Sequence, residues 1–218
     1  MDAMRCDVVV LTEPPPALAA AEGRVVLSPA CRMGPNGWES WVAVMGDGVV
    51  PAAIDLPFER MAAAAVLSIS GDLVVVYGSV LPWNAAAVQE PGLALTGESA
   101  AAMFARVLAS QEADVASLRA TYPDAVVLWV GDFNQTLCGP NFGGSAQKRH
   151  SLTLSLQRLG MVAWNADARH ALDRMCAIDL VCGPKEVAVG DVTYVDPAAG
   201  GVVLSDHAGY VVEVRSLR

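Results

Sequence analysis

Short apolar runs, separated by glycine, proline and small polar residues, recur along the chain and predict a domain rich in β-strands. One longer segment, residues 99–122, predicts a helix, because Ser99 can cap its first turn and Pro123 ends it. Shorter helices are expected over residues 17–22 and 151–159. The expected strands are residues 8–11, 24–28, 41–45, 49–54, 62–70, 73–80, 125–130, 178–181, 192–195 and 210–214.

The order of these elements favours a mixed sheet covered by helices. Strands alternate with helices, but a turn signal such as Gly46-Asp47-Gly48 also predicts a hairpin, with residues 49–54 returning beside 41–45. Residues 61–83 carry a single charge, Asp72, which raises the question of a membrane span. Because Ser70-Gly71-Asp72 has the composition of a turn, we expect two strands there and no membrane span.

Composition limits the class of partner. The 218 residues suffice for one domain with a sizeable core, and the apolar share of 54% is inflated by alanine. The net charge of −9 opposes unspecific binding to a nucleic-acid backbone, which requires clustered lysine and arginine. It does not exclude an enzyme in which bound cations offset the local negative charge.

The cysteine pattern favours a reducing compartment. None of the five forms a Cys-x-x-Cys pair, and their number is odd. We therefore expect reduced, mostly buried thiols in a cytoplasmic protein without a signal peptide, with a zinc site as the alternative. The five are Cys6, Cys31, Cys138, Cys176 and Cys182.

The strongest chemical signal is Gly131-Asp132-Phe133-Asn134, which follows the apolar run at residues 125–130. Side chains two residues apart lie on the same side of a strand, so Asp132 and Asn134 can address one bound atom if the backbone stays extended. The alternative is an Asx-type turn that closes the strand.

Three further polar groups adjoin predicted strands. Glu13 follows the run at residues 8–11 and suits a Mg²⁺ ligand, although taken alone it is better explained as a simple turn residue. Asp179 lies inside an apolar strand, where a carboxylate is costly unless it is paired. Asp206-His207 places an acid beside an imidazole, with a surface or capping histidine as the alternative. We expect the remaining histidines, at positions 150 and 170, to be surface residues.

These motifs together resemble the endonuclease/exonuclease/phosphatase superfamily, the DNase I-like proteins. The resemblance covers nearly the whole chain, and it implies an α/β (α+β) four-layer sandwich of two mixed β-sheets flanked by helices. It also implies hydrolysis of phosphodiesters or phosphomonoesters with Mg²⁺ or Mn²⁺. The matching segments, in the family's order, are Leu11-Thr12-Glu13, residues 77–83, Gly131-Asp132-Phe133-Asn134, Ile178-Asp179-Leu180 and Ser205-Asp206-His207.

The resemblance implies a role for each matching residue. Glu13 would hold the metal ion, and Asp206 would contribute to its surroundings directly or through water. Asp132 would orient or deprotonate the attacking water. Asn134 would donate a hydrogen bond to the phosphate or position the nucleophile.

The last pair completes the implied site. His207, oriented by Asp179, would stabilise the phosphoryl oxygens or assist proton transfer. The carboxylates of Glu13, Asp132 and Asp206 and the ring of His207 are therefore expected to converge, with Asp179 behind the ring.

The chain departs from the family pattern in two places. Members usually begin with a strand that ends in Asn, whereas here the glutamate-bearing strand is the first, starting at Val8. We interpret residues 1–218 as a single domain that lacks this strand, through truncation, rearrangement or completion by a partner. In addition, Val80 and Leu81 stand where many members have His or Tyr.

Two functions remain open. One is an active phosphoester hydrolase, and the other is a weak or inactive member that binds a phosphorylated ligand or a protein. For an enzyme, Lys148-Arg149 gives thin support for a DNA substrate, and tryptophans 38, 41 and 83 either form an apolar rim for lipid or pack in the core. A nucleotide or sugar phosphate suits the acidity best, and the sequence leaves the oligomeric state open.

Overall fold

A computed structural model describes residues 6–20, 23–32, 38–52, 61–86, 94–140 and 144–216. Its centre is a six-stranded sheet in the order β10-β11-β9-β8-β7-β6. All neighbours in this sheet are antiparallel except β8 and β9, so the sheet is mixed. Its strands are β6 (Val50–Pro51), β7 (Ala62–Ile69), β8 (Asp72–Val80), β9 (Val126–Asp132), β10 (Met161–Ala163) and β11 (Asp179–Pro184).

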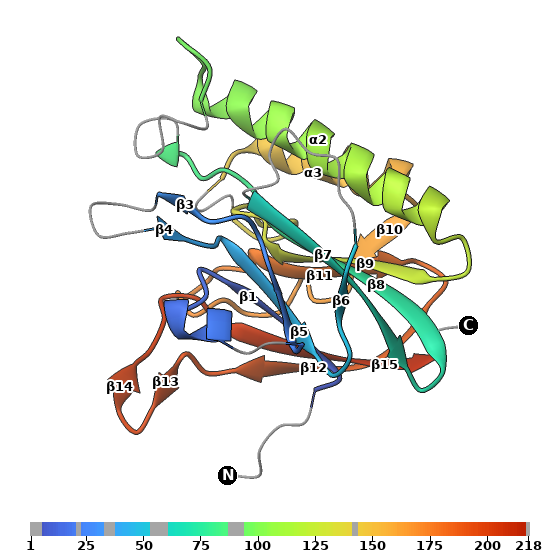
Figure 1. Ribbon diagram of the computed structural model, residues 1–218. Coiled ribbons are helices and arrows are strands. Elements are labelled where there is room, and N and C mark those ends of the chain that lie inside the picture. The colour runs from blue at the N-terminus through green and yellow to red at the C-terminus, as the bar shows by residue number, and fades with distance from the viewer. Residues whose placement is uncertain are drawn as a thin grey trace.

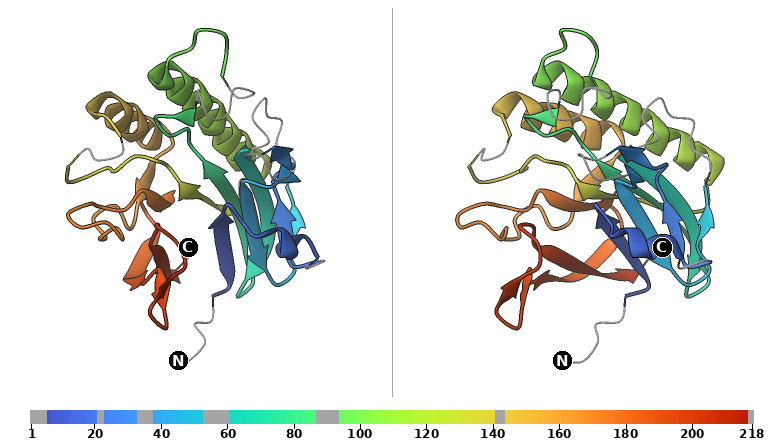
Figure 2. Two further views of the ribbon diagram at one scale, coloured as in Figure 1. Left: turned by 90° about the vertical axis from the view of Figure 1, so that its left-hand side faces the viewer. Right: turned by 60° about the vertical axis from the view of Figure 1, so that its left-hand side comes forward.

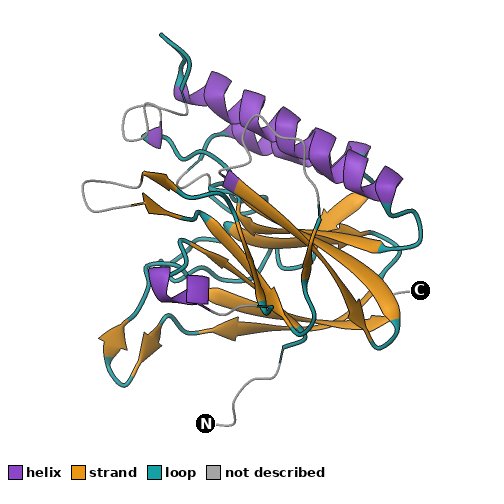
Figure 3. Ribbon diagram, in the orientation of Figure 1, coloured by secondary structure: helices purple, strands orange, loops and turns teal. Residues whose placement is uncertain are grey.

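Two helices cover the outer face of this sheet (Figures 1 and 3). Helix α2 (Ala100–Thr121) makes the crossover between the parallel strands β8 and β9, and α3 (Ala146–Arg158) lies beside it. The side chains of Ser99 and Ser145 cap the two helices by accepting hydrogen bonds from backbone N–H groups in the first turn. Because Ser145 caps α3, that helix begins five residues before the predicted start at 151.

The inner face of the large sheet packs against a second layer. This layer contains a three-stranded antiparallel sheet, β1-β5-β2, in which β5 packs on β7 and β8. A ribbon of β12 and β15 lies on the same side of the large sheet as β1 (Figure 2). The longer strands are β1 (Val8–Thr12), β2 (Val25–Leu27), β5 (Val42–Gly46), β12 (Ala188–Val195) and β15 (Gly209–Ser216). Two short antiparallel pairs are β3 (Cys31–Arg32) with β4 (Trp38–Glu39), and β13 (Ala198–Ala199) with β14 (Val202–Val203).

The hydrophobic core occupies both faces of the large sheet, one against the helices and the other against the second layer. Residues 74–80 of β8 are all buried, because α2 covers one face of this strand and β5 the other. Such two-sided burial explains why the strand is a continuous apolar run instead of an alternating one. The predicted sandwich is confirmed, with the parallel pairing confined to the six-stranded sheet among the described strands.

Several local predictions need correction. The hairpin expected at Gly46-Asp47-Gly48 is wrong, because β6 pairs with β7 in the large sheet while β5 pairs with β1 and β2. The turn therefore carries the chain from one layer to the other. Residues 53–54 of the expected return strand lie outside the described residues. The helix expected at 17–22 is a 3-10 helix, η1 (Pro16–Ala20), in the part that is described.

The segment considered as a membrane span forms the hairpin β7–β8, with Ser70 and Gly71 at its turn, both at positive φ. No helix in the described part of the chain is long and apolar enough to cross a membrane.

Candidate active site

Asp132 and Asn134 are joined by a turn at the end of β9. The backbone N–H of Asn134 donates to Asp132 Oδ1 at 2.7 Å, and its side-chain Nδ2 donates to Asp132 Oδ2 at 2.7 Å. The φ of Asn134 is +48°, so the chain is no longer extended there. Of the two arrangements that the sequence left open, the two side chains therefore meet through the Asx-type turn and not through strand alternation.

Gly131 permits the tight approach of β9 to β8 just before this turn. Its φ is +141°, and a Cβ at this position would lie 2.0 Å from the backbone oxygen of Ser79. The same neighbour anchors the strand, because Trp129 Nε1 donates to Ser79 Oγ at 2.7 Å. Only glycine fits both the backbone angle and the available space, so it fixes where Asp132 leaves the sheet.

Asp179 lies beside Asp132 because the two residues are direct partners across the antiparallel strands β9 and β11. Its Oδ2 lies 2.9 Å from His207 Nδ1, which comes from the loop before β15. Burying an unpaired carboxylate in an apolar strand would cost free energy, and the pairing of Asp179 with His207 offsets this cost. The predicted dyad of Asp179 and His207 is present in the structure.

Glu13 and Asp206 complete the acidic group from two other loops. Glu13 follows β1 at φ +51°, and its backbone N–H donates to the Trp41 oxygen at 2.8 Å. Its charge acts on Asp132, and the charge of Asp206 acts on His207. Both residues are exposed, and neither carboxylate has a hydrogen-bond or ion-pair partner among the described residues.

Burial, hydrogen bonding and neighbouring charges shift two pKa values in this group. Asp132 is 8% exposed, and burial, followed by the charge of Asp179, raises its pKa far above the usual range of a carboxyl group. The hydrogen bond to Asp179 raises the pKa of His207 to about 9, against an opposing effect of burial. At neutral pH, His207 is therefore an imidazolium facing carboxylates.

His170, expected at the surface, is instead buried with 5% exposure, and it stacks edge-on against His207 at 5.7 Å between ring centroids. Its Nδ1 accepts from the Leu172 N–H at 3.0 Å, while its Nε2 has no partner among the described residues. Burial and the charge of His207 lower its pKa. No local pattern distinguished it from His150, which is exposed as predicted.

His170, Asp179 and His207 also form a group in which one ligand atom of each lies within 4.8 Å of the others. Two imidazoles with one carboxylate suit zinc-like cations better than Mg²⁺, which prefers an all-oxygen set. By donor type the oxygen ligands of Glu13 and Asp206 suit a magnesium ion better, but no group of three or more described residues that contains either of them has its ligand atoms within 4.8 Å of one another.

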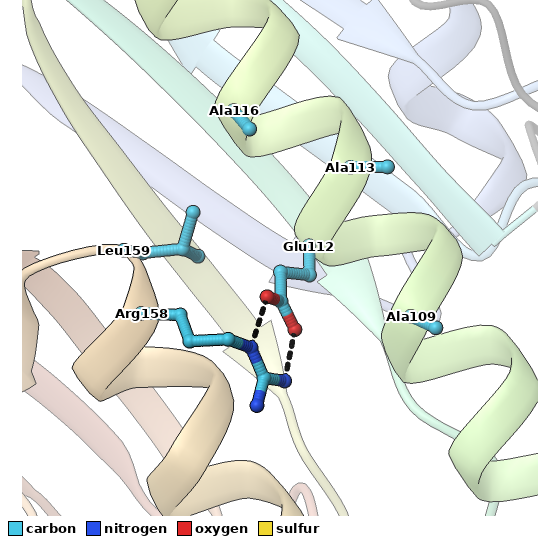
Figure 4. Close-up of a pocket in the computed structure, with 6 residues that line it drawn as sticks. All are labelled: Ala109, Glu112, Ala113, Ala116, Arg158 and Leu159. Atoms are coloured by element: carbon cyan, nitrogen blue, oxygen red, sulfur yellow. Dashed lines mark hydrogen bonds and ion pairs between the residues drawn. The ribbon is translucent and has the colours of Figure 1, made fainter.

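A groove of about 420 Å³ lies between α2 and α3, on the outer face of the helices (Figure 4). Arg158 and Glu112 cross it with two hydrogen bonds of 2.6 Å. No member of the acidic group lines it, and it offers no unpaired catalytic group. Its lining residues are Ala109, Glu112, Ala113, Ala116, Arg158 and Leu159.

Comparison with solved structures identifies the architecture. A 3'-5' exonuclease (NExo) from Neisseria meningitidis superposes over 95% of this chain and 89% of its own, with a TM-score of 0.62 and 19% identity. The chain has the endonuclease/exonuclease/phosphatase fold. An endonuclease/exonuclease/phosphatase from Beutenbergia cavernae matches with a TM-score of 0.62 and 17% identity, over 96% of this chain and 62% of its own.

The endonuclease domain of TRAS1, a telomere-specific non-LTR retrotransposon, gives a TM-score of 0.57 at 11% identity, over 97% of this chain and 87% of its own. No family model and no curated protein matches the sequence.

Proposed function

We propose that this protein is a divalent-metal-dependent phosphoester hydrolase, with its active site at the ends of β1, β9 and β11. The observation that carries the proposal is the continuous set of contacts from Asn134 through Asp132 and Asp179 to His207. This arrangement links a carboxylate that can activate water to an imidazolium that can face a phosphate. The similarity of fold to two nucleases supports the same class of reaction.

The donor set fits Mg²⁺ or Mn²⁺. Both ions prefer oxygen ligands, and Glu13 and Asp206 offer exposed carboxylates without partners among the described residues. Burial, and after it the negative charges of Asp179 and Glu13, raises the pKa of Asp132. A bound cation would offset this negative charge. A bound ion would supply Lewis-acid polarisation of a phosphoryl oxygen.

Asp132 would orient the attacking water and accept its proton. Without a metal ion its pKa is about 8, so the carboxyl is largely protonated at neutral pH; the positive charge of a bound cation would lower this pKa and leave the carboxylate able to accept a proton. Asn134 uses both amide hydrogens, one on Asp132 and one on the Leu81 oxygen at 2.9 Å. We therefore assign Asn134 to positioning the Asp132 carboxylate, in place of a direct bond to phosphate.

His207 would stabilise the charge that develops on the phosphoryl oxygens or donate a proton to the leaving group. With a pKa of about 9, its ring is protonated at neutral pH. Asp179 occupies Nδ1, which leaves the Nε2–H as the remaining donor. Asp179 thus sets both the orientation and the charge of the ring.

The substrate is proposed as a phosphate ester of a nucleic acid or nucleotide. Two of the similar solved structures are named as nucleases, but the net charge of −9 favours small or single-site substrates over long duplexes. A lipid substrate is disfavoured, because Trp41 is 2% exposed and packs against Trp83 at 5.4 Å between ring centroids. The side chain of Trp38 lies outside the described residues.

The test is hydrolysis of bis-p-nitrophenyl phosphate and of a DNA duplex with one abasic site, with Mg²⁺, with Mn²⁺ or with EDTA. We expect turnover that EDTA abolishes, and Glu13→Gln should raise the Mg²⁺ concentration for half-maximal rate by about tenfold or more. Asp47→Asn is the matched control, because this acid is exposed in a turn between the layers. Turnover that persists in EDTA would contradict the proposal, and phosphate-ligand binding without turnover would favour an inactive binding protein.

A further inference from the structure

Two cysteines that are 38 positions apart in sequence meet beside the candidate active site. Cys138 Sγ lies 2.7 Å from Cys176 Sγ, and both residues are half-buried thiols. This separation is close to the length of about 2.05 Å that a disulfide requires. The expectation of mostly buried thiols is wrong for the described side chains, since Cys6 is exposed and only Cys182 is buried.

The backbone around Cys138 holds its thiol in this position. Arg149 of α3 donates to the Cys138 oxygen at 3.2 Å and to the Thr136 oxygen at 2.9 Å. The following residue, Gly139, has φ +63°, and a Cβ there would lie 2.9 Å from Cys176 Sγ. A glycine at this position therefore allows the loop to approach the second sulfur.

Cys176 is fixed from the other side. It forms an isolated bridge with Arg169, and the next residue, Ala177, donates to the Ala168 oxygen at 2.8 Å. Tyr210 of β15 donates its hydroxyl to the Arg169 oxygen at 2.8 Å, which ties the same segment to the ribbon. Both thiols thus lie on backbone held by several hydrogen bonds, so their proximity does not depend on a single side-chain rotamer.

We propose that Cys138 and Cys176 are a redox modification site that closes to an intramolecular disulfide on reaction with a low-molecular-weight disulfide such as oxidised glutathione. The thiolate of one cysteine attacks the glutathione disulfide, which forms a mixed disulfide and releases one glutathione thiolate. The second cysteine then attacks the protein sulfur of that mixed disulfide and releases the other glutathione. Two protein thiols are oxidised, one glutathione disulfide is reduced, and the two thiol protons pass to the solvent or to the released thiolates.

The crosslink would join two segments that carry site residues. Cys138 lies four residues after Asn134, and Cys176 lies three residues before Asp179. Closing a loop of this length constrains the unfolded chain, so the oxidised protein should melt about 10 °C higher than the reduced protein. The disulfide forms whether or not the site hydrolyses phosphate esters.

The experiment uses the whole 218-residue chain. The protein is reduced and then transferred without oxygen to glutathione buffers of increasing oxidised fraction. Burial, together with the hydrogen bond to Cys176, raises the pKa of Cys138 to about 11, so the exchange is run at about pH 8.5 to increase the thiolate fraction. Free thiols are alkylated in denaturant, and the protein is digested and mapped by mass spectrometry. We expect a disulfide-linked peptide pair that contains Cys138 and Cys176, from monomeric protein. Cys182 should stay a free thiol during the exchange and should therefore be recovered in its alkylated form.

Two variants test the assignment. Cys138→Ser should retain one glutathione on Cys176 as a stable mixed disulfide and lose the rise in melting temperature, whereas Cys6→Ser should behave as the parent protein. Glutathione that stays attached to the parent protein without a crosslink would overturn the proposal, as would a crosslink involving other cysteines. The peptide map of the parent protein decides the question even if a variant fails to fold.

Discussion

Replacing Asp179 with asparagine tests the electrostatic design of the site. The hydrogen bond from His207 to Asp179, together with the charge of that carboxylate, raises the pKa of the ring from 6.5 to about 9. At about 1.36 kcal/mol per pKa unit, this difference corresponds to about 3 kcal/mol of preference for the charged ring. The side chain of His207 is 32% exposed, so solvent screening reduces the expected contribution to about 1–2 kcal/mol.

The pH dependence of this stabilisation has a definite sign. The folded pKa lies above the unfolded value, so the contribution is fully present below about pH 6.5 and is lost as pH rises through about 9. In Asp179→Asn, the pKa of His207 should fall towards its ordinary value of 6.5, because the ring loses both the hydrogen bond and the charge of Asp179. The difference in free energy of unfolding between the two proteins should therefore be larger at about pH 6 than at about pH 10.

Proton NMR titration measures this pKa directly, because the chain has only three histidines. The His207 resonance is assigned with His207→Gln, and the titration is run in EDTA. A His207 pKa that stays near 9 in Asp179→Asn would refute the claim that this carboxylate sets the charge of the ring.

Three further variants and one glycine control test the fold by urea denaturation. Gly131→Ala should cost about 3 kcal/mol or more, because its Cβ would meet the Ser79 backbone, whereas Gly71→Ala, at φ +90° with no atom within 4 Å, should cost only about 1–2 kcal/mol. Equal costs would contradict the steric explanation. Ser99→Ala should cost about 1 kcal/mol by removing the cap of α2, and no change would show that the cap is unimportant. Tyr77→Phe should cost about 1–3 kcal/mol, because its hydroxyl donates to a buried carboxylate at 2.7 Å, and a neutral result would deny that bond a structural role.

Much of the fold was predictable because its signals are local. The strands at residues 62–70 and 73–80 are long apolar runs with a turn between them, and the helix at 99–122 has its cap and its stop in the sequence. The partners of a strand depend on distant segments instead. The β5–β6 hairpin was therefore predicted wrongly, since the same turn residues serve a crossing between layers.

The candidate site was predictable where its residues lie at the ends of strands, because those strand ends meet at one edge of the sheet. Asp132, Asp179 and His207 were found in this way, and the structure brings them together. His170 was missed because its burial comes from packing against a loop distant in sequence. The contact between Cys138 and Cys176 likewise arises from two loops whose sequences carry no shared pattern.

Hydrolysis of bis-p-nitrophenyl phosphate in Mg²⁺ or Mn²⁺ by the parent protein and by Asp132→Ala tests the central claim most directly. Removing the carboxylate that would activate water should lower the rate constant by about 10²–10⁴-fold while the protein stays folded. Asp47→Ala, which removes an exposed acid, should retain the parent rate. A metal-dependent rate in Asp132→Ala within about threefold of the parent would contradict the assignment of this residue and of the site built around it.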